Sequence, residues 1–417
     1  MGRLLWSPYA PILLRILREY RLMITIQGGT SGVGEAVVRE LATRGAQIVL
    51  LTQHALTDPF LVSYIDDLRA ETSNQLITAE QVDLASLHSI RTFATKWIDN
   101  APPRRLDLVI LCANTITPKS IDIQSTPSEG IEVNWQINYL ANFHLLSILS
   151  PALRAQPPDR DVRVLFGTCS SYLGGDLLHI TQQASQHTKS TNPKTSTAIP
   201  EPTKFSPGNA HATSKLALTT FALAFQKHLS GYKRPDNMPM NTKVLLVDPG
   251  MSRTPGMRRW LTFGSLFGLL LYLLFYPIVW LVLKSPSMGA QSFLYAAMEE
   301  RFNRVGKFEP PPGPSSATPG DGEGGSSVPM IKECASRPFG RDDVQDEAAQ
   351  KKLWEYSEKM VLEAEKRGAS ERAKLKKDGK EREGVVQAEK EIREYKEKVG
   401  KKEGVKKEGS RRSKKAG

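Results

Sequence analysis

The sequence predicts an α/β fold in which helices cover both faces of a doubly wound parallel sheet. Two observations predict it. From residue 22 onward, short apolar strands alternate with segments of helical periodicity, and residues 107–112 form the nearly continuous apolar run of a strand that is buried on both faces. The length of 417 residues and the hydrophobic share of 40% exclude a fibrous or wholly disordered chain.

The elements follow one another in a regular order. Apolar and β-branched residues predict strands over residues 22–27, 47–51, 76–82, 107–112, 162–167 and 242–247. Helical spacing of apolar residues predicts helices over residues 33–43, 126–149 and 211–229. Strand, helix and strand repeated at this spacing imply right-handed crossovers, so the strands are expected to be parallel.

Composition divides the rest of the chain into segments around this domain. Residues 1–21 are basic and amphipathic, which is typical of a helix at a membrane interface or of one packed on the domain. The expected organisation continues with the α/β domain over 22–308 including a polar insertion at 176–208, a Pro/Gly/Ser-rich linker at 309–340, a docking helix at 341–368, and a charged Lys/Glu-rich tail, solvated or disordered, at 369–417.

Residues 261–283 form an apolar segment of 23 residues without a charged side chain. A bilayer is spanned by about 20 apolar residues. Cationic and aromatic side chains flank or punctuate the segment, as at membrane interfaces: Arg258, Arg259, Trp260, Tyr272, Tyr276, Trp280 and Lys284. We expect membrane contact here, through a full span or an interfacial position, with short helices that cover a substrate cleft as the alternative.

Charge and cysteine content restrict the partners. The formal net charge is +12, but residues 351–417 hold 23 Lys and Arg against 14 Asp and Glu, so the excess belongs to the tail. Interspersed Glu and few aromatic residues favour anionic lipid over nucleic acid. The ending with Lys414 and Lys415 resembles a dilysine signal of endoplasmic reticulum membrane proteins. The scattered Cys112, Cys169 and Cys334 predict neither a disulfide framework nor a metal site.

A glycine-rich turn lies between the first strand and the first helix. It reads GGTSGVG, and a helix that starts there offers backbone N–H groups to the pyrophosphate of a dinucleotide. The residues expected to bind that cofactor are Gly28, Thr30, Ser31, Gly32, Val33 and Gly34.

Together with later motifs, this turn resembles the short-chain dehydrogenase/reductase family, which binds NAD(P)(H) on a Rossmann fold. The motifs are QVDLAS after the third strand, a loop after the fourth strand, HATSKLAL, and a Pro-Gly turn with Thr254. The resemblance implies that the cofactor is also contacted by Asp83, Leu84, Cys112, Ala113, Asn114, Lys215, Pro249, Gly250 and Thr254.

Three stretches are similar to the membrane-associated retinol dehydrogenase-like branch of that family: INYLANFHLL, LVLKSPSMGAQSFLYAA and KKLWEYSEKMV. The branch acts on retinoids, steroids, polyprenoids and related lipids. The resemblance therefore implies a hydrophobic small-molecule substrate, which fits the apolar segment because such molecules partition into a bilayer.

The resemblance also implies a catalytic set, in which one member is replaced. Asn138 and Lys215 match the family, but His211 stands where the catalytic tyrosine is expected. The position of the catalytic serine has more than one candidate. Counting from Arg163 along the fifth strand without a gap places Cys169 there, whereas a one-residue bulge places Ser170 there, and Thr168 is adjacent. Because imidazole titrates near ~6.5, His211 could donate a proton as imidazolium. Alternatively, it is a non-catalytic replacement, and neighbouring Lys215 disfavours its charge.

The end of the second strand bears on cofactor choice, because NAD enzymes carry an acid there. Residues 50–54 contain no acid, and Thr52 or Gln53 could bind a 2′-phosphate, so NADP(H) is expected over NAD(H). We therefore predict an NADP(H)-dependent oxidoreductase that interconverts a hydrophobic alcohol and its carbonyl compound, bound to endoplasmic reticulum or lipid droplets with its catalytic domain facing the cytosol. The alternative is a catalytically degenerate nucleotide-binding scaffold at the membrane.

Overall fold

The computed structural model of the protein describes residues 22–100, 104–117, 125–126, 129–177, 209–299, 302 and 328–375. The chain comprises two compact units, Met1–Glu363 and Ala364–Gly417. In the second unit, residues 364–375 are helical. The predictions for the N-terminal segment, and most of those for the polar insertion and the charged tail, lie outside the described residues.

The first unit contains one eight-stranded sheet in the order β3-β2-β1-β4-β5-β6-β7-β8. All neighbouring strands are parallel except β7 and β8. The predicted doubly wound parallel sheet is thus confirmed. The strands are β1 (Met23–Gln27), β2 (Gln47–Thr52), β3 (Ile77–Gln81), β4 (Leu108–Leu111), β5 (Val162–Gly167), β6 (Thr242–Asp248), β7 (Met330–Lys332) and β8 (Ala335–Arg337).

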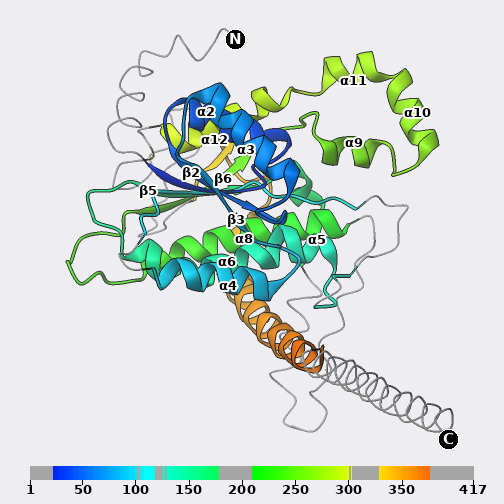
Figure 1. The fold of residues 1–417 in the computed structure, drawn as a ribbon. Helices are drawn as coiled ribbons and strands as arrows, with labels where there is room; N and C mark the ends of the chain where they lie inside the picture. Colours follow the sequence, from blue (N-terminus) through cyan, green and yellow to red (C-terminus); the bar gives the residue numbers. More distant parts are fainter. Residues whose placement is uncertain are drawn as a thin grey trace, which may run out of the picture. The chain divides into compact units, whose positions relative to one another are not determined.

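Helices cover both faces of this sheet (Figure 1). One layer contains α2 (Gly32–Thr43), α3 (Pro59–Thr72) and α12 (Pro286–Met298), and the other α4 (Leu87–Ile98), α6 (Ala141–Arg154) and α8 (Ala210–Ser230). A hydrophobic core joins the first layer to the sheet, with Ile24 and Ile26 of β1 against Val37 and Leu41 of α2. The parallel strands direct their carboxyl ends to one edge, where loops leading into the helices form a site.

The helix expected over 126–149 begins later. A short α5 (Val133–Trp135) and a π-helical turn, η1 (Gln136–Leu140), precede α6. The carboxylate of Glu132 accepts hydrogen bonds from the N–H groups of Asn134 and Trp135, at 2.9 and 2.7 Å, and so caps α5. Residues 125–126 and 129–132 instead belong to a loop, in which Thr126 N–H donates to the carbonyl of Ile131 at 2.7 Å.

The prediction of a linker over residues 309–340 is wrong for the last part of this range, because strands β7 and β8 lie within residues 330–337. Ile331 pairs with Val247 of β6 and is fully buried. Glu333 and Cys334 adopt positive φ angles in the tight turn between the two strands. Apolar residues at the start of β7 therefore extend the sheet. A short 3-10 turn, η4 (Asp342–Gln345), and a helix from residue 347 follow, and Trp354 of that helix packs on Phe143 and Phe221.

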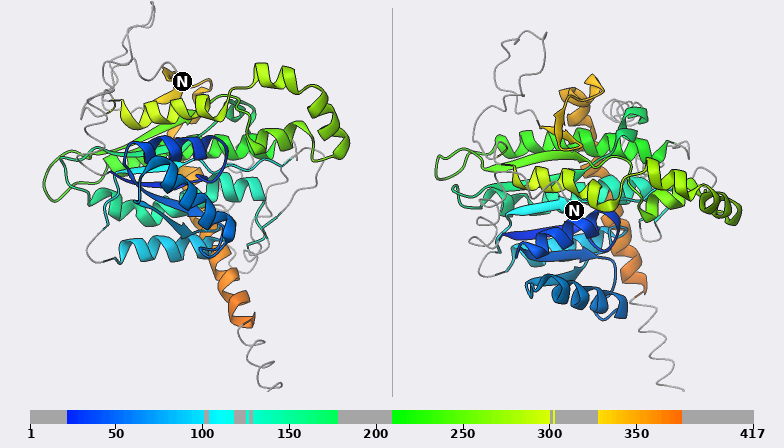
Figure 2. Two further views of the ribbon diagram at one scale, coloured as in Figure 1. Left: turned by 45° about the horizontal axis from the view of Figure 1, so that its top comes forward. Right: turned by 90° about the horizontal axis from the view of Figure 1, so that it is seen from above.

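The apolar segment forms two short helices, α10 (Leu266–Leu274) and α11 (Tyr276–Val282), and a third, α9 (Pro255–Leu261), directly precedes it. None of the helices in the described ranges has the length and apolar character that a membrane crossing requires. The three helices project from the layered domain (Figures 1 and 2). The segment that carries these helices begins and ends at the same place on the domain. Arg253 N–H donates to the Lys284 carbonyl at 2.8 Å, and Lys284 N–H donates to the Met251 carbonyl at 3.1 Å.

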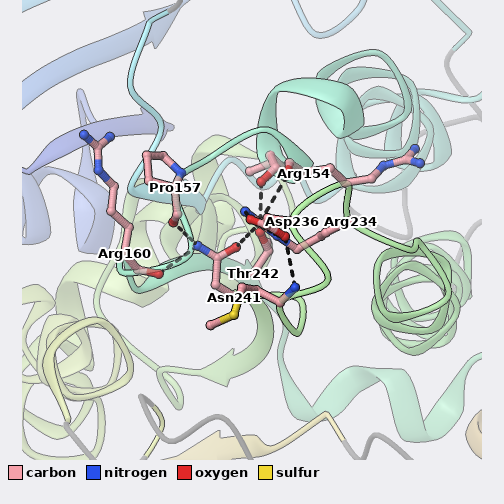
Figure 3. A network of polar contacts seen from close by, with 9 residues as sticks. Arg154, Pro157, Arg160, Arg234, Asp236, Asn241 and Thr242 are labelled. Atoms are coloured by element: carbon pink, nitrogen blue, oxygen red, sulfur yellow. Dashed lines mark hydrogen bonds and ion pairs between the residues drawn. The ribbon is translucent and has the colours of Figure 1, made fainter.

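A polar clip secures the opposite edge of the sheet, where β5 and β6 begin (Figure 3). Asn241 donates to the carbonyls of Pro157 and Arg160 at 2.7 and 2.9 Å and accepts from the guanidinium of Arg234 at 3.1 Å. Arg234 also pairs with Asp236 at 2.7 Å. The clip ties the strand β6 to the loop that follows α6, and thereby holds the strand whose far end enters the site.

We expect Asn241→Ala to lower the free energy of unfolding by about 3 kcal/mol, because it leaves two carbonyl groups and part of a buried guanidinium unpaired. The exposed Lys233 in the same loop provides the matched control, and Lys233→Ala should change stability by less than about 0.5 kcal/mol. Urea denaturation of the full chain measures both variants. Equal stabilities of the two would contradict the role assigned to the clip.

Candidate active site

The residues predicted for the site gather at the carboxyl ends of four neighbouring strands. The glycine-rich turn follows β1, the Cys112–Asn114 loop follows β4, Cys169 to Ser171 follow β5, and Pro249 to Thr254 follow β6. Lys215 and His211 reach this edge from the first turns of α8. The parallel topology therefore brings together groups that lie more than 200 residues apart.

The turn after β1 has the shape of a cradle for a phosphate group. Gly28 has a φ of +71°, and a Cβ on it would lie 2.8 Å from the backbone of Ala113. A Cβ on Gly34 would lie 2.2 Å from the carbonyl oxygen of Gly28. Only glycine fits at either place, and the start of α2 is thereby held close to the end of β1. The first N–H groups of a helix have no partner within it and can bind a phosphate. The residues present fit a dinucleotide.

A second wall of the cradle comes from the end of β6. Gly32 has a φ of +60°, and a Cβ on it would lie 3.1 Å from the methyl group of Thr254. The Thr254 hydroxyl accepts from Met257 N–H at 3.2 Å and caps α9. A Cβ on Gly289 would approach both Val33 and Pro249. The turns after β1 and β6 are thus in contact, as the sequence motifs imply.

The end of β2 and the loop after β3 offer polar groups for the rest of the cofactor. Thr52 is buried and its hydroxyl accepts from His54 N–H at 3.3 Å, whereas the Gln53 side chain is exposed. The carboxylate of Asp83 accepts from Ala85 N–H at 2.9 Å, which shapes the loop. The carbonyl of Leu84 accepts from Gln136 of η1 at 3.2 Å.

Lys215 lies at the centre of the site. Its side chain is almost fully buried, and its ammonium group donates to the carbonyl of Gly167 at 3.0 Å. Burial lowers the pKa of Lys215, while Cys169, Cys112 and Asp248 act in the opposite sense. This cation therefore lies between the ends of β4, β5 and β6.

Asn138 has a structural position beside the catalytic groups. Its carbonyl oxygen accepts from Thr115 N–H at 2.8 Å, and its amide donates to the Thr115 carbonyl and to the Ser214 hydroxyl at 2.9 and 3.1 Å. Ser214 in turn donates to the carbonyl of His211 at 2.8 Å. Both N–H groups of the Asn138 amide are thus engaged, and they tie the loop after β4 to the turn of α8 that carries His211.

His211 is held between two elements. Its Nδ1 lies 3.3 Å from the hydroxyl of Ser171, and its Nε2 lies 3.2 Å from Oδ1 of Asn114. Burial, and secondly the charge of Lys215, lowers the pKa of His211 to about 3. The lowered pKa favours a neutral imidazole at neutral pH, and so favours the expected alternative in which burial and Lys215 disfavour an imidazolium donor at His211. Only the tertiary surroundings reveal this burial.

The three candidates for the catalytic serine point in different directions. The hydroxyl of Ser170 donates to Asp248 at 2.7 Å and accepts from Lys332 of β7 at 2.8 Å. Thr168 is buried against Thr219, at 3.1 Å between the hydroxyl oxygens. The thiol of Cys169 instead lies 2.9 Å from the hydroxyl of Ser171. Ser170 therefore does not join His211, and the hydroxyl that does is Ser171.

Ser171 was not among the residues predicted from sequence. It belongs to the 3-10 helix η2 (Ser170–Gly174), and the course of this short helix turns Ser171, rather than Ser170, toward α8. Segments far along the chain hold η2. Gly340 N–H donates to the Tyr172 hydroxyl at 2.8 Å, and Arg341 donates to the Gly175 carbonyl at 2.6 Å. The run of hydroxyl residues after β5 was the available sequence signal.

We expect Gly34→Ala to abolish saturable binding of NADPH and NADH, because the added Cβ collides with the Gly28 carbonyl and displaces the start of α2. Gly174→Ala is the control, since nothing lies within 4 Å of its Cβ. Cofactor fluorescence titration measures binding, and thermal unfolding shows that both variants are folded. Wild-type affinity in a folded Gly34→Ala protein would contradict the cradle.

Comparison with known proteins agrees with this arrangement. Residues 22–162 match the family model described as short chain dehydrogenase. An uncharacterized oxidoreductase of Schizosaccharomyces pombe is 38% identical over 85% of either chain. Polyprenol dehydrogenase of Mus musculus is 30% identical over 67% of this chain and 72% of its own, and retinol dehydrogenase 13 of Homo sapiens is 28% identical over 82% and 85%. The chain thus belongs to the short-chain dehydrogenase/reductase family of oxidoreductases.

Proposed function

We propose that the protein is an NADP(H)-dependent oxidoreductase that interconverts a hydrophobic alcohol and its carbonyl compound at a membrane surface. One juxtaposition carries the proposal. The exposed apolar helices α9 to α11 begin directly after Thr254, which contacts Gly32 of the cofactor cradle. A lipid substrate that is collected by these helices arrives beside the cofactor. The names of the relatives, retinol and polyprenol dehydrogenases, support a lipid alcohol as the substrate class.

The surface of α9 to α11 fits a membrane interface. Leu266 and Leu281 are exposed by 87% and 79%, far more than apolar side chains in a folded core. Arg258 and Arg259 are exposed on α9, and Arg253 lies 5.3 Å from the ring of Trp280. Apolar side chains next to cations favour a bilayer that contains anionic lipids. We propose endoplasmic reticulum or lipid droplets as the membrane, with the catalytic domain facing the cytosol.

The proposed cofactor is NADP(H). The turn from Gly28 to Gly34 and Thr254 would hold its pyrophosphate and nicotinamide ends, and Lys215 its ribose. When bound, it supplies or accepts the hydride. Gln53 is exposed at the end of β2 and is available for a 2′-phosphate. The nearby acid Asp58 is paired with His54, at 2.8 Å. The titration that tests the cradle also tests this preference, which requires tighter binding of NADPH than of NADH.

His211 carries the proton transfer in this proposal, because it stands where the family has tyrosine. Nε2 faces Oδ1 of Asn114, which can only accept, so Nε2 carries the proton of the neutral ring and is the atom that offers it to a developing alkoxide. Asn138 acts indirectly, through Ser214, on the position of His211. The replacement of tyrosine by a neutral imidazole also favours the second candidate function, that of a nucleotide-binding scaffold without turnover.

We expect His211→Phe to slow ketone reduction by about 10²- to 10⁴-fold, the usual contribution of a general acid. His211→Tyr should keep or raise the rate, since it restores a phenolic donor beside Lys215. The exposed His88 on α4 is the control, and His88→Phe should match the wild type. Because the pKa of His211 is about 3, the rate of ketone reduction should not change with pH between 5 and 8 through titration of this residue.

Single-turnover oxidation of NADPH with a long-chain ketone measures these rates. Wild-type activity in His211→Phe would show that His211 is not the donor. Turnover by His211→Tyr alone would favour the scaffold.

We expect the protein to sediment with vesicles that contain anionic lipid, and replacement of Leu270, Leu271, Leu273 and Leu274 by Ser to release it. These four side chains are 40–70% exposed, so their replacement removes membrane contacts and leaves the core intact. Replacement of the equally exposed Leu56 and Val62 by Ser is the control. Sedimentation that is the same for both sets of variants would assign membrane binding to another part of the chain.

A further inference from the structure

A continuous chain of hydrogen bonds runs along the floor of the site. The thiol sulfur of Cys169 lies 2.9 Å from the Ser171 hydroxyl, which lies 3.3 Å from Nδ1 of His211. On the other side of the ring, Nε2 lies 3.2 Å from Oδ1 of Asn114. Three elements contribute to the chain: the segment after β5, the start of α8 and the loop after β4. It thus crosses the position where the family has its catalytic tyrosine.

The donors of this chain all point in one direction. Oδ1 of Asn114 is an acceptor, so Nε2 of His211 carries the proton. Nδ1 of the neutral ring is then an acceptor, and the Ser171 hydroxyl donates to it. The oxygen of Ser171 is left to accept from the Cys169 thiol. A proton that leaves Nε2 can therefore be replaced, step by step, from the thiol.

A neutral imidazole that donates a proton needs a source from which that proton is replaced. It gives up its Nε2 proton readily only when Nδ1 gains another proton at the same time. Along the chain, the thiol is the most acidic uncharged donor, since model thiols titrate near ~8.5 and an aliphatic hydroxyl stays protonated. The ammonium of Lys215 interacts electrostatically with Cys169.

We propose that Cys169 supplies the proton for carbonyl reduction through a relay that consists of Cys169, Ser171 and His211. The inference rests on the proposed oxidoreductase function. NADPH held at the glycine-rich turn would supply the hydride. The alkoxide would replace Oδ1 of Asn114 as the acceptor of the Nε2 proton of His211, while Nδ1 takes the proton of Ser171 and Ser171 takes the thiol proton of Cys169. The products are the alcohol, NADP⁺ and a thiolate next to Lys215, which water reprotonates before the next turnover.

The other ionisable groups around the relay have separate roles. Asp248 is engaged with Ser170, and Lys332 faces the same serine from β7. Burial raises the pKa of the Cys112 thiol to about 12, so this cysteine remains protonated. Lys215 is the cation nearest the relay on α8 and donates to Gly167. Of the ionisable groups on the described elements around the site, only Cys169 and His211 belong to the relay.

The test compares single-turnover reduction of a long-chain methyl ketone by NADPH between pH 5 and 10 in full-length variants. In the wild type, the rate should fall as pH rises through the midpoint of Cys169 ionisation, measured independently from its rate of alkylation by iodoacetamide. Cys169→Ser keeps the hydrogen bond but loses the acidity, so it should slow reduction at least about 10²-fold and remove that limb. Ser171→Ala should have the same effect, and Ser171→Thr should restore the rate.

Cys334→Ser is the matched control, because Cys334 is exposed in the β7–β8 turn, and it should retain both the rate and the limb. A Cys169→Ser or Cys169→Ala protein with the wild-type rate and limb would overturn the relay and leave the proposed function standing. A wild type that binds NADPH but reduces no hydrophobic ketone would overturn both. NADPH binding in every variant shows that it is folded.

Discussion

The close approach of two backbone segments at Gly34 is the constraint on which the site depends. The first turn of α2 lies so near the carbonyl of Gly28 that no side chain fits between them. Gly28 itself lies close to Ala113 after β4, and Gly32 of α2 lies close to Thr254 after β6. Three strand ends are thereby held at fixed positions around the start of α2, and a bound dinucleotide would meet oriented N–H groups there. A wider turn would separate these loops and leave the catalytic groups without a common cofactor.

Burial determines the chemistry of the groups at this edge. Lys215 is almost fully buried and His211 is partly buried, and burial lowers the pKa of each. For the histidine, this lowering favours a neutral ring, the second of the two alternatives that the sequence left open. A neutral ring transfers a proton only as part of a chain, which gives the contacts with Ser171 and Asn114 their meaning.

The supports of the site come from segments that are distant in the sequence. Gly340 and Arg341, beyond the Pro/Gly/Ser-rich region, hold the 3-10 helix that carries Ser171. The backbone of Lys284 bonds to Met251 and Arg253 where the segment of α9 to α11 begins and ends, and its side chain pairs with Glu333 in the β7–β8 turn. The exposed apolar helices and the added strands therefore share a fastening point. Movement of these helices at a lipid surface would act on the same edge of the sheet that holds Ser171 and His211.

The sequence by itself determined the order of strands and helices, because apolar periodicity and glycine spacing are local properties. The six long strands, the glycine cradle and the placement of Lys215 beside it could be predicted in this way. The three-residue strands β7 and β8 could not, since so short a run between Gly, Pro and Ser carries no periodicity. Only the tertiary structure decided that Ser171 rather than Ser170 faces His211 and that the histidine is neutral. Both depend on the direction of a 3-10 turn and on burial by neighbours from other strands, which no local pattern encodes.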